Sequence, residues 1–112
     1  MMDALFANPP APPYYAVIFT SLRQPGDEGY EAMSQRMSAL AEASPGFLGV
    51  ESVRDAQGCG ITVSYWARLE DIQRWKADAE HLLAQRQGRE KWYAAYRTRI
   101  CRVERAYGFD AE

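Results

Sequence analysis

The chain has 112 residues, of which 47% are hydrophobic and 25% charged, a balance typical of one globular domain. Its formal net charge is −2, so nothing draws the chain as a whole toward nucleic acid or an anionic membrane surface. No apolar stretch approaches the roughly 20 residues that span a bilayer, and the first residues lack the basic and apolar parts of a signal peptide. We therefore expect a cytoplasmic protein that binds neither nucleic acid nor membrane.

Residues 1–13 are predicted to form a flexible arm, because the prolines at positions 9, 10, 12 and 13 cannot donate hydrogen bonds to a sheet. The folded domain is expected over residues 14–112. Its first strand is predicted over residues 14–22, which are dense in β-branched and aromatic side chains. A helix is predicted over residues 28–44, with Asp27 as its N-cap and apolar residues at helical spacing.

Two further strands are predicted over residues 47–55 and 60–66, and the short link between them indicates an antiparallel hairpin. A second helix is predicted over residues 69–87 and a last strand over residues 95–107. The order β-α-β-β-α-β predicts a ferredoxin-like α+β fold, in which two helices cover one face of a four-stranded antiparallel sheet. A second copy of the chain is the economical cover for the other face, so we expect a homodimer.

Two cysteines, Cys59 and Cys101, are fewer than a small secreted domain held by disulfides usually carries. Neither has a second cysteine or a histidine at metal-ligand spacing, so no metal site is expected. We expect two reduced, partly buried thiols.

Three stretches at the predicted strand and helix junctions resemble the antibiotic biosynthesis monooxygenase (ABM) family, including its relatives that degrade heme. Together they cover roughly residues 14–107. They are Pro45-Gly46-Phe47 with Arg54-Asp55; Tyr65-Trp66 with Asp71-Ile72 and Trp75-Lys76; and Asp78, Glu80-His81 and Ala84-Gln85 with Gly88-Arg89, Trp92-Tyr93 and Tyr96.

The resemblance implies a dimeric α+β barrel with a pocket between the sheet and the helices. Some members of this family oxygenate polyketide-like aromatic substrates without metal or flavin, and others bind and degrade heme. The heme-degrading members place a heme-ligating histidine where this chain has Gln85, and a pocket asparagine where it has Phe19. Because an amide is a poor iron ligand, heme is disfavoured and no cofactor is expected. The antibiotic-oxygenating members carry an asparagine where this chain has Thr62.

Thr62, Ser64 and Trp66 share the face of the third strand that is expected to lie under the helices. We interpret Trp66 as a wall of a ligand pocket and the two hydroxyls as polar handles, with a core tryptophan as the alternative. Trp75 lies on the apolar side of the second helix, where core packing and pocket lining are both open. The predicted substrate-binding set is Thr62, Ser64, Trp66, Trp75, Phe19, Gln85 and Tyr93.

His81 is the only histidine, and it is the candidate catalytic base because imidazole titrates near neutral pH unaided. In an unbroken helix of about 100° per residue, however, it lies opposite Ile72 and faces solvent. A kink near Asp78 would be needed to turn it inward. The alternative is a surface histidine that bonds to Asp78.

Tyr65, Tyr93 and Tyr96 are expected near the tryptophans, where they either orient a phenolic substrate or complete the core. Arginines of the C-terminal third either bind a carboxylate or phenolate ligand or form a solvated strand face with salt bridges across a dimer. These arginines are Arg86, Arg89, Arg97, Arg99, Arg102 and Arg105.

Three functions follow from these features. The first is an ABM-like monooxygenase without a cofactor, whose small aromatic or polyketide-like substrate loses a proton and passes electrons to O₂. The second is a non-catalytic dimer that holds a small hydrophobic molecule in the same pocket. The third, disfavoured, is heme binding or degradation.

Overall fold

The computed structural model describes residues 5–26, 29–85 and 92–111. Its elements follow one another as β-α-β-β-α-β, which confirms the predicted ferredoxin-like α+β fold. They are the strands β1 (Tyr14–Arg23), β2 (Phe47–Arg54), β3 (Cys59–Trp66) and β4 (Tyr93–Val103), and the helices α2 (Tyr30–Ala43) and α3 (Leu69–Gln85).

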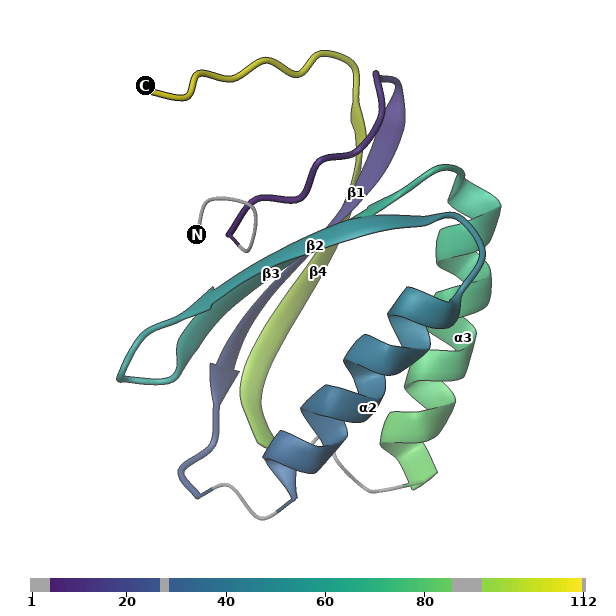
Figure 1. Ribbon diagram of the computed structural model, residues 1–112. Helices are drawn as coiled ribbons and strands as arrows, with labels where there is room; N and C mark the ends of the chain where they lie inside the picture. The colour runs from purple at the N-terminus through teal and green to yellow at the C-terminus, as the bar shows by residue number, and fades with distance from the viewer. Residues whose placement is uncertain (1–4, 27–28, 86–91, 112) are drawn as a thin grey trace.

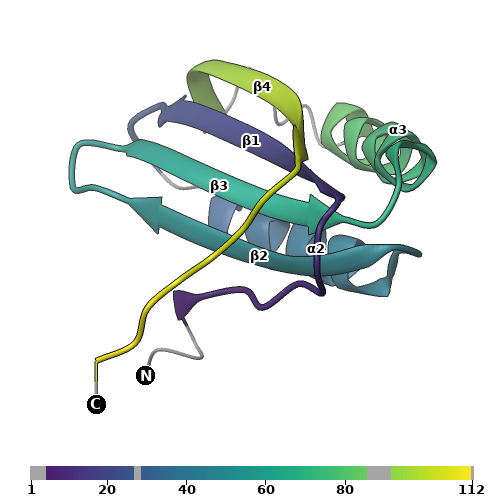
Figure 2. The same ribbon diagram turned by 90° about the horizontal axis from the view of Figure 1, so that it is seen from above.

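The four strands form one antiparallel sheet in the order β2-β3-β1-β4. Both helices lie on the same side of this sheet, as Figures 1 and 2 show. The arm before β1 and the extended segment after β4 lie on the other side (Figure 1). The arm contacts its own sheet there, since the backbone N–H of Ala7 donates to Glu51 Oε2 at 3.1 Å.

The predicted bounds need small corrections. β4 begins at Tyr93 rather than at residue 95, because Tyr93 still pairs with Arg23 beyond a bulge. β4 ends at Val103 rather than at residue 107, because Val103 pairs with Tyr14, which is the first residue of β1. The N-cap of α2 is Gly29, with φ 75°, and not the predicted Asp27. Residues 27 and 28, and residues 86 and 87 at the predicted end of the second helix, lie outside the described residues.

The core lies between the helices and one end of the sheet. Trp66 is fully buried there together with Val17, Ala41 and Ile72. Tyr15, Phe47 and Trp75 pack against this group. Burying one large aromatic or aliphatic side chain stabilises a fold by about 1.5–3 kcal/mol, so this small cluster supplies much of the stability.

Gly46, between α2 and β2, lets the second strand approach the start of α3. Its φ is 81°, a backbone conformation that favours glycine, and a side chain here would collide with the carboxylate of Asp71. Asp71 is buried and accepts a hydrogen bond from Arg68 Nε at 3.2 Å. The carbonyl of Gly46 accepts from the N–H of Ala67 at 2.8 Å, which ties the entry of α3 to the same turn.

Cys59 and Cys101 are free and exposed, so the predicted partial burial was wrong for the single chain. Their positions in the register put both on the sheet face opposite the helices. Within the described residues, neither α2 nor α3 is long and apolar enough to cross a membrane.

Candidate functional site

The register of the sheet arranges the helix-facing side chains in rows that each cross all four strands. The first row is Phe47, Trp66, Tyr15 and Arg102, and the second is Val50, Ser64, Val17 and Ile100. The third is Ser52, Thr62, Phe19 and Thr98, and the fourth is Arg54, Gly60, Ser21 and Tyr96. The first row therefore carries three large aromatic side chains, whereas hydroxyls lie beside single aromatic side chains in the third and fourth rows.

Phe47, Trp66 and Trp75 form the first of two aromatic groups, which we call the tryptophan cluster. The rings of Trp66 and Trp75 lie 5.1 Å apart and tilted by 35°, and Phe47 meets Trp66 edge-on at 5.4 Å. The indole N–H of Trp66 donates to Ser64 Oγ at 2.9 Å, so this hydroxyl satisfies a buried donor. The indole nitrogen of Trp75 is buried and has no hydrogen-bond partner among the described residues.

Phe19, Tyr30, Tyr93 and Tyr96 form the second group, the tyrosine cluster. Phe19 lies 5.6 Å from Tyr93 and 5.2 Å from Tyr96, measured between ring centroids. Tyr93 also meets Tyr96 at 5.7 Å and Tyr30 at 6.2 Å, both nearly edge-on. All four side chains are only half-buried, although they belong to the helix-facing side of the fold. An aromatic surface that stays partly open under covering helices is suited to hold a flat apolar molecule.

A pair of hydroxyls lies in the row that contains Phe19. Ser52 Oγ and Thr62 Oγ1 are hydrogen-bonded at 2.7 Å, and Thr62 is directly opposite Phe19 on the neighbouring strand. Ser52 is exposed and Thr62 half-buried, so the pair is accessible to a ligand. Each hydroxyl has further donor or acceptor capacity beyond this bond, and the pair can therefore bind an oxygen of a substrate.

Two arginines that were not among the predicted site residues, Arg23 and Arg54, lie next to the tyrosine cluster. Arg23 holds its guanidinium carbon 3.5 Å from the centre of the Tyr30 ring. Arg54 donates to Ser21 Oγ at 2.7 Å. Burial raises the pKa of Tyr93, as do the charge interaction and the hydrogen bond with Tyr30, while Arg54 and Arg23 oppose this rise. Tyrosine is protonated at neutral pH even at its ordinary pKa, and these effects keep Tyr93 protonated to a higher pH.

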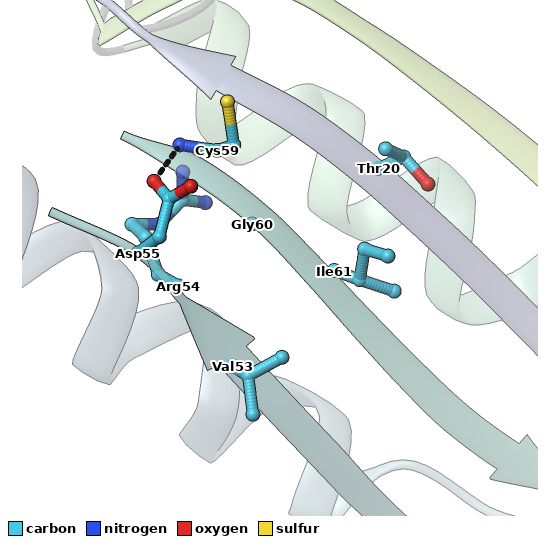
Figure 3. A pocket seen from close by; sticks show the side chains of 7 residues that line it. All are labelled: Thr20, Val53, Arg54, Asp55, Cys59, Gly60 and Ile61. Carbon is cyan, nitrogen blue, oxygen red and sulfur yellow. Dashed lines mark hydrogen bonds between the residues drawn. The ribbon is translucent and has the colours of Figure 1, made fainter. Parts of the chain in front are cut away.

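The opposite face of the sheet carries a shallow depression of about 440 Å³. Figure 3 shows Val53, Ile61 and Thr20, which line it, on three neighbouring strands. The register places these side chains on the face away from the helices. Val53 is 65% exposed and Ile61 45% exposed, so this is an open apolar surface rather than an enclosed site.

A family model described as antibiotic biosynthesis monooxygenase matches residues 13–87. This chain belongs to the ABM family. A Bacillus subtilis (strain 168) protein, YqjZ, described as uncharacterized, is 50% identical over 105 residues, which are 94% of this chain and 91% of that protein.

Solved structures with the same fold have low sequence identity to this chain. SnoaB, a cofactor-independent oxygenase from Streptomyces nogalater, superposes with a TM-score of 0.70 at 11% identity, over 85% of this chain and 97% of SnoaB. PA3566 from Pseudomonas aeruginosa gives a TM-score of 0.59 at 20% identity, over 88% of this chain and 99% of PA3566. At such identities these likenesses show that the ABM fold is shared.

His81, the candidate base, lies on the outer side of α3. The helix is continuous from Leu69 to Gln85, and His81 is exposed while Ile72 is buried. This geometry agrees with the surface interpretation of the histidine. The side chain of Gln85, at the position where heme-degrading ABM relatives carry a ligand, lies outside what the structure describes.

Tyr65 does not join Tyr93 and Tyr96, so that part of the expected grouping was wrong. It lies on the opposite face, where its hydroxyl donates to Glu51 Oε1 at 2.7 Å and its ring meets Tyr14 edge-on. Burial raises the pKa of Tyr65, and the hydrogen bond to the Glu51 carboxylate raises it further. Alternation along β3 separates Tyr65 from Trp66, its neighbour in sequence, by the full thickness of the sheet.

Proposed function

We propose that this ABM-family protein is a cofactor-independent monooxygenase, and that its small aromatic or polyketide-like substrate binds beside the tyrosine cluster. The observation that carries the proposal is a half-buried aromatic surface, with an accessible hydroxyl pair, on the same face as the core around the fully buried Trp66. Family membership and the fold shared with SnoaB, which is described as a cofactor-independent oxygenase, support the reaction class.

In this site the substrate ring packs on Phe19 and Tyr93, and its oxygens bond to Thr62 and to the protonated hydroxyl of Tyr93. Trp66 and Trp75 form the rigid packed end of the same face, and Ser64, which lies between Trp66 and Thr62 on β3, keeps Trp66 in place. The buried N–H of Trp75, which lacks a partner among the described residues, offers one more donor to a substrate oxygen. Gln85 completes the proposed set.

The reaction consists of proton loss followed by electron transfer to O₂. A substrate with an acidic phenol or enol loses its proton, and the resulting anion reduces O₂ and then bonds to it at carbon. Loss of water from the resulting peroxide leaves a new carbonyl group. A CH₂ group thus becomes C=O, one oxygen atom enters the product, the other leaves in water, and the substrate supplies all four electrons. No metal or flavin is required by this balance.

The proton has two routes in this proposal. His81 is exposed, so a general-base role for it requires a relay through water. In the direct route the substrate proton passes to solvent water beside the accessible hydroxyls of Ser52 and Thr62. This route suffices when the bound substrate is acidic.

Oxygen consumption tests the proposal. We expect a panel of anthrones and polyphenols to contain a substrate whose oxygenation consumes one O₂ per molecule, and Phe19→Ala to lower kcat/KM at least about tenfold. Leu69→Ala, at an exposed apolar side chain that begins α3, is the control and should leave turnover unchanged. Tight binding of panel members with no oxygen uptake would favour the alternative, a non-catalytic small-molecule-binding protein.

We also propose that the protein is a homodimer that pairs through the sheet face opposite the helices. This face exposes Val53 and Ile61, and the extended segment after β4 exposes Tyr107 by 99% and Phe109 by 87%. Apolar and aromatic side chains in such positions are typical of an interface. A cytoplasmic location is part of the proposal, and the free thiols fit a reducing compartment.

The sheet offers a matched pair of variants for the dimer. Ile61 and Val50 are each 45% exposed but lie on opposite faces. We expect Ile61→Lys to give a monomer in sedimentation equilibrium and Val50→Lys to remain a dimer. A monomeric wild-type protein at micromolar concentration would contradict this interface.

A further inference from the structure

We propose that Arg23 and Arg54 form an anion-binding corner, and that it takes the ionised oxygen of an aromatic phenolate or enolate. The inference rests on the proposed function and names the chemical class of its substrate. We use the term arginine corner for these two residues together with Ser21. It lies at the end of the helix-facing side that is remote from the tryptophan cluster.

The fold makes room for Arg54 by omitting a side chain from β3. Gly60 lies between Arg54 and Ser21 in the fourth row, and a Cβ at Gly60 would be 2.5 Å from Cζ of Arg54. Without that Cβ, the guanidinium crosses over β3 and donates to Ser21 Oγ at 2.7 Å and to the carbonyl of Gly58. The guanidinium group of Arg54 is thereby held over Gly60, while the side chain stays accessible to solvent.

Arg23 approaches the same place from β1. Its backbone N–H donates to the carbonyl of Gly58 at 3.1 Å, the carbonyl to which Arg54 also donates. Its Nη2 donates to the carbonyl of Gly26 at 3.0 Å, and its guanidinium stacks on Tyr30. Its Nε is buried and has no hydrogen-bond partner among the described residues. A buried guanidinium N–H that remains unused is an independent indication of a missing acceptor.

The charge of this corner is not neutralised within the described part of the chain. Ion pairs there join Arg68 to Asp71 and Lys76 to Glu80, and neither Arg23 nor Arg54 takes part in one. The field of both guanidinium groups reaches the hydroxyl of Tyr93, because both lower its pKa against the effects of burial and Tyr30. An oxygen of a ligand bound beside Tyr93 would experience the same field.

The corner explains how the site ionises a substrate when its only histidine is exposed. The phenol or enol O–H bond breaks, the proton goes to solvent water, and the electron pair stays on the oxygen that faces the guanidinium groups. The two positive charges favour the charged form of this oxygen, and they lower its pKa where their attraction exceeds the desolvation that raises the pKa of Tyr93 in spite of them. The anion that must react with O₂ is then the bound form at neutral pH.

The test uses the intact protein with 4-nitrophenol, whose ionised form is coloured, and with its methyl ether 4-nitroanisole, which cannot ionise. We expect binding to lower the pKa of 4-nitrophenol by about one unit, which means that the anion binds about tenfold more tightly than the neutral phenol. The Arg23→Gln/Arg54→Gln double variant should abolish this shift and bind 4-nitroanisole within about twofold of the wild type. Arg74→Gln, at an exposed arginine on α3, removes one positive charge, as Arg54→Gln does, and should keep the pKa shift found with wild type.

The outcomes separate the corner from the site. If the wild type binds both probes but leaves the pKa of 4-nitrophenol unchanged, the corner is wrong and the proposed site stands. If Arg74→Gln removes the shift as fully as the double variant, general charge explains it and the corner is also wrong. If the wild type binds neither probe, the site itself is contradicted. The measurement on wild type needs no variant, and Arg54→Gln alone, at an exposed side chain, substitutes for a double variant that fails to fold.

Discussion

The tryptophan and tyrosine clusters lie on the same face of the same sheet, under the same two helices, yet they differ in what surrounds them. In the tryptophan cluster Phe47 and Trp75 are also half-buried, but they enclose Trp66, which is 0% exposed and whose N–H is satisfied by a buried serine hydroxyl. In the tyrosine cluster every ring is half-buried, and the neighbouring serine hydroxyl is exposed. Aromatic content alone therefore does not distinguish a core from a site.

The rows of the sheet show where the change occurs. Ser64 and Thr62 are two residues apart on β3, but the first bonds inward to an indole and the second bonds to accessible Ser52. One step of the pleat, about 7 Å, thus separates a hydroxyl that serves stability from one that is available to a ligand.

Truncation of the central tryptophan should have the largest effect. We expect Trp66→Ala to lower the free energy of unfolding by about 3–5 kcal/mol, because it leaves a cavity in the packed end. Tyr96→Ala should cost about 1–2 kcal/mol, since its ring is already half-buried. Urea denaturation followed by circular dichroism measures both. Equal losses would show that the two ends are packed alike.

A methyl group at the turn before β2 should come next. Gly46→Ala is expected to cost about 2–3 kcal/mol, from the positive φ and from the collision with Asp71. Gly26→Ala has a similar φ of 91° but open space around the added carbon, so it should cost about 1 kcal/mol. The difference between the two melting curves isolates the collision. Without a difference, Asp71 moves aside freely.

The two hydroxyls of β3 should respond in opposite ways. Thr62→Val should lower kcat/KM or ligand affinity about tenfold while changing the unfolding free energy by less than about 0.5 kcal/mol. Ser64→Ala should cost about 1–2 kcal/mol of stability, because it leaves the Trp66 N–H unsatisfied, with a smaller effect on affinity. Loss of affinity in Ser64→Ala alone would move the site to the tryptophan end.

Tyr93 should make the stability of the protein depend on alkaline pH. Its pKa is raised in the folded state, so the folded protein retains a proton that the unfolded chain loses near pH 10. The resulting stabilisation is complete below about pH 10 and is lost as the pH rises above that value. Tyr93→Phe should make this decline shallower in denaturation curves between neutral and alkaline pH, and Tyr65, whose pKa is also raised, should account for what is left. Tyr107→Phe, at a 99% exposed side chain, serves as its control.

The smallest effect is expected at the histidine. Because His81 is exposed and the arginine corner stabilises the substrate anion, His81→Gln should change kcat/KM by less than about threefold. Its pH–rate profile should keep the shape found for wild type. A large loss together with a missing ionisation near neutral pH would establish His81 as the base.

The fold could be predicted from the sequence because the spacing of apolar residues and the positions of the turn-forming residues indicate the same elements along the chain. The apolar spacing in residues 30–43 and 69–85 and the alternation in residues 59–66 each allow one element type. The face assignment of Thr62, Ser64 and Trp66 followed from that alternation and is confirmed by the register. The start of β4 was harder to predict from the sequence, since Tyr93 pairs with Arg23 only beyond a bulge.

The site was less predictable, because it depends on which strands are neighbours and in which register. Arg23 is the last residue of β1 and Arg54 the last residue of β2, and the two are 31 positions apart in the sequence. From the sequence alone, each is expected to be an ordinary solvent-exposed arginine. Gly60 shows its role only when the register places it between Arg54 and Ser21. Only the two β1–β3 and β2–β3 registers together, which no single segment encodes, reveal the corner.

The close indole pair gives the protein an internal optical reporter. Two rings 5.1 Å apart and tilted by 35° are coupled in their electronic transitions, and the coupling depends steeply on their separation and angle. The near-ultraviolet circular dichroism of this protein should therefore record whether a molecule that binds at the tyrosine cluster disturbs the tryptophan cluster, without any attached dye.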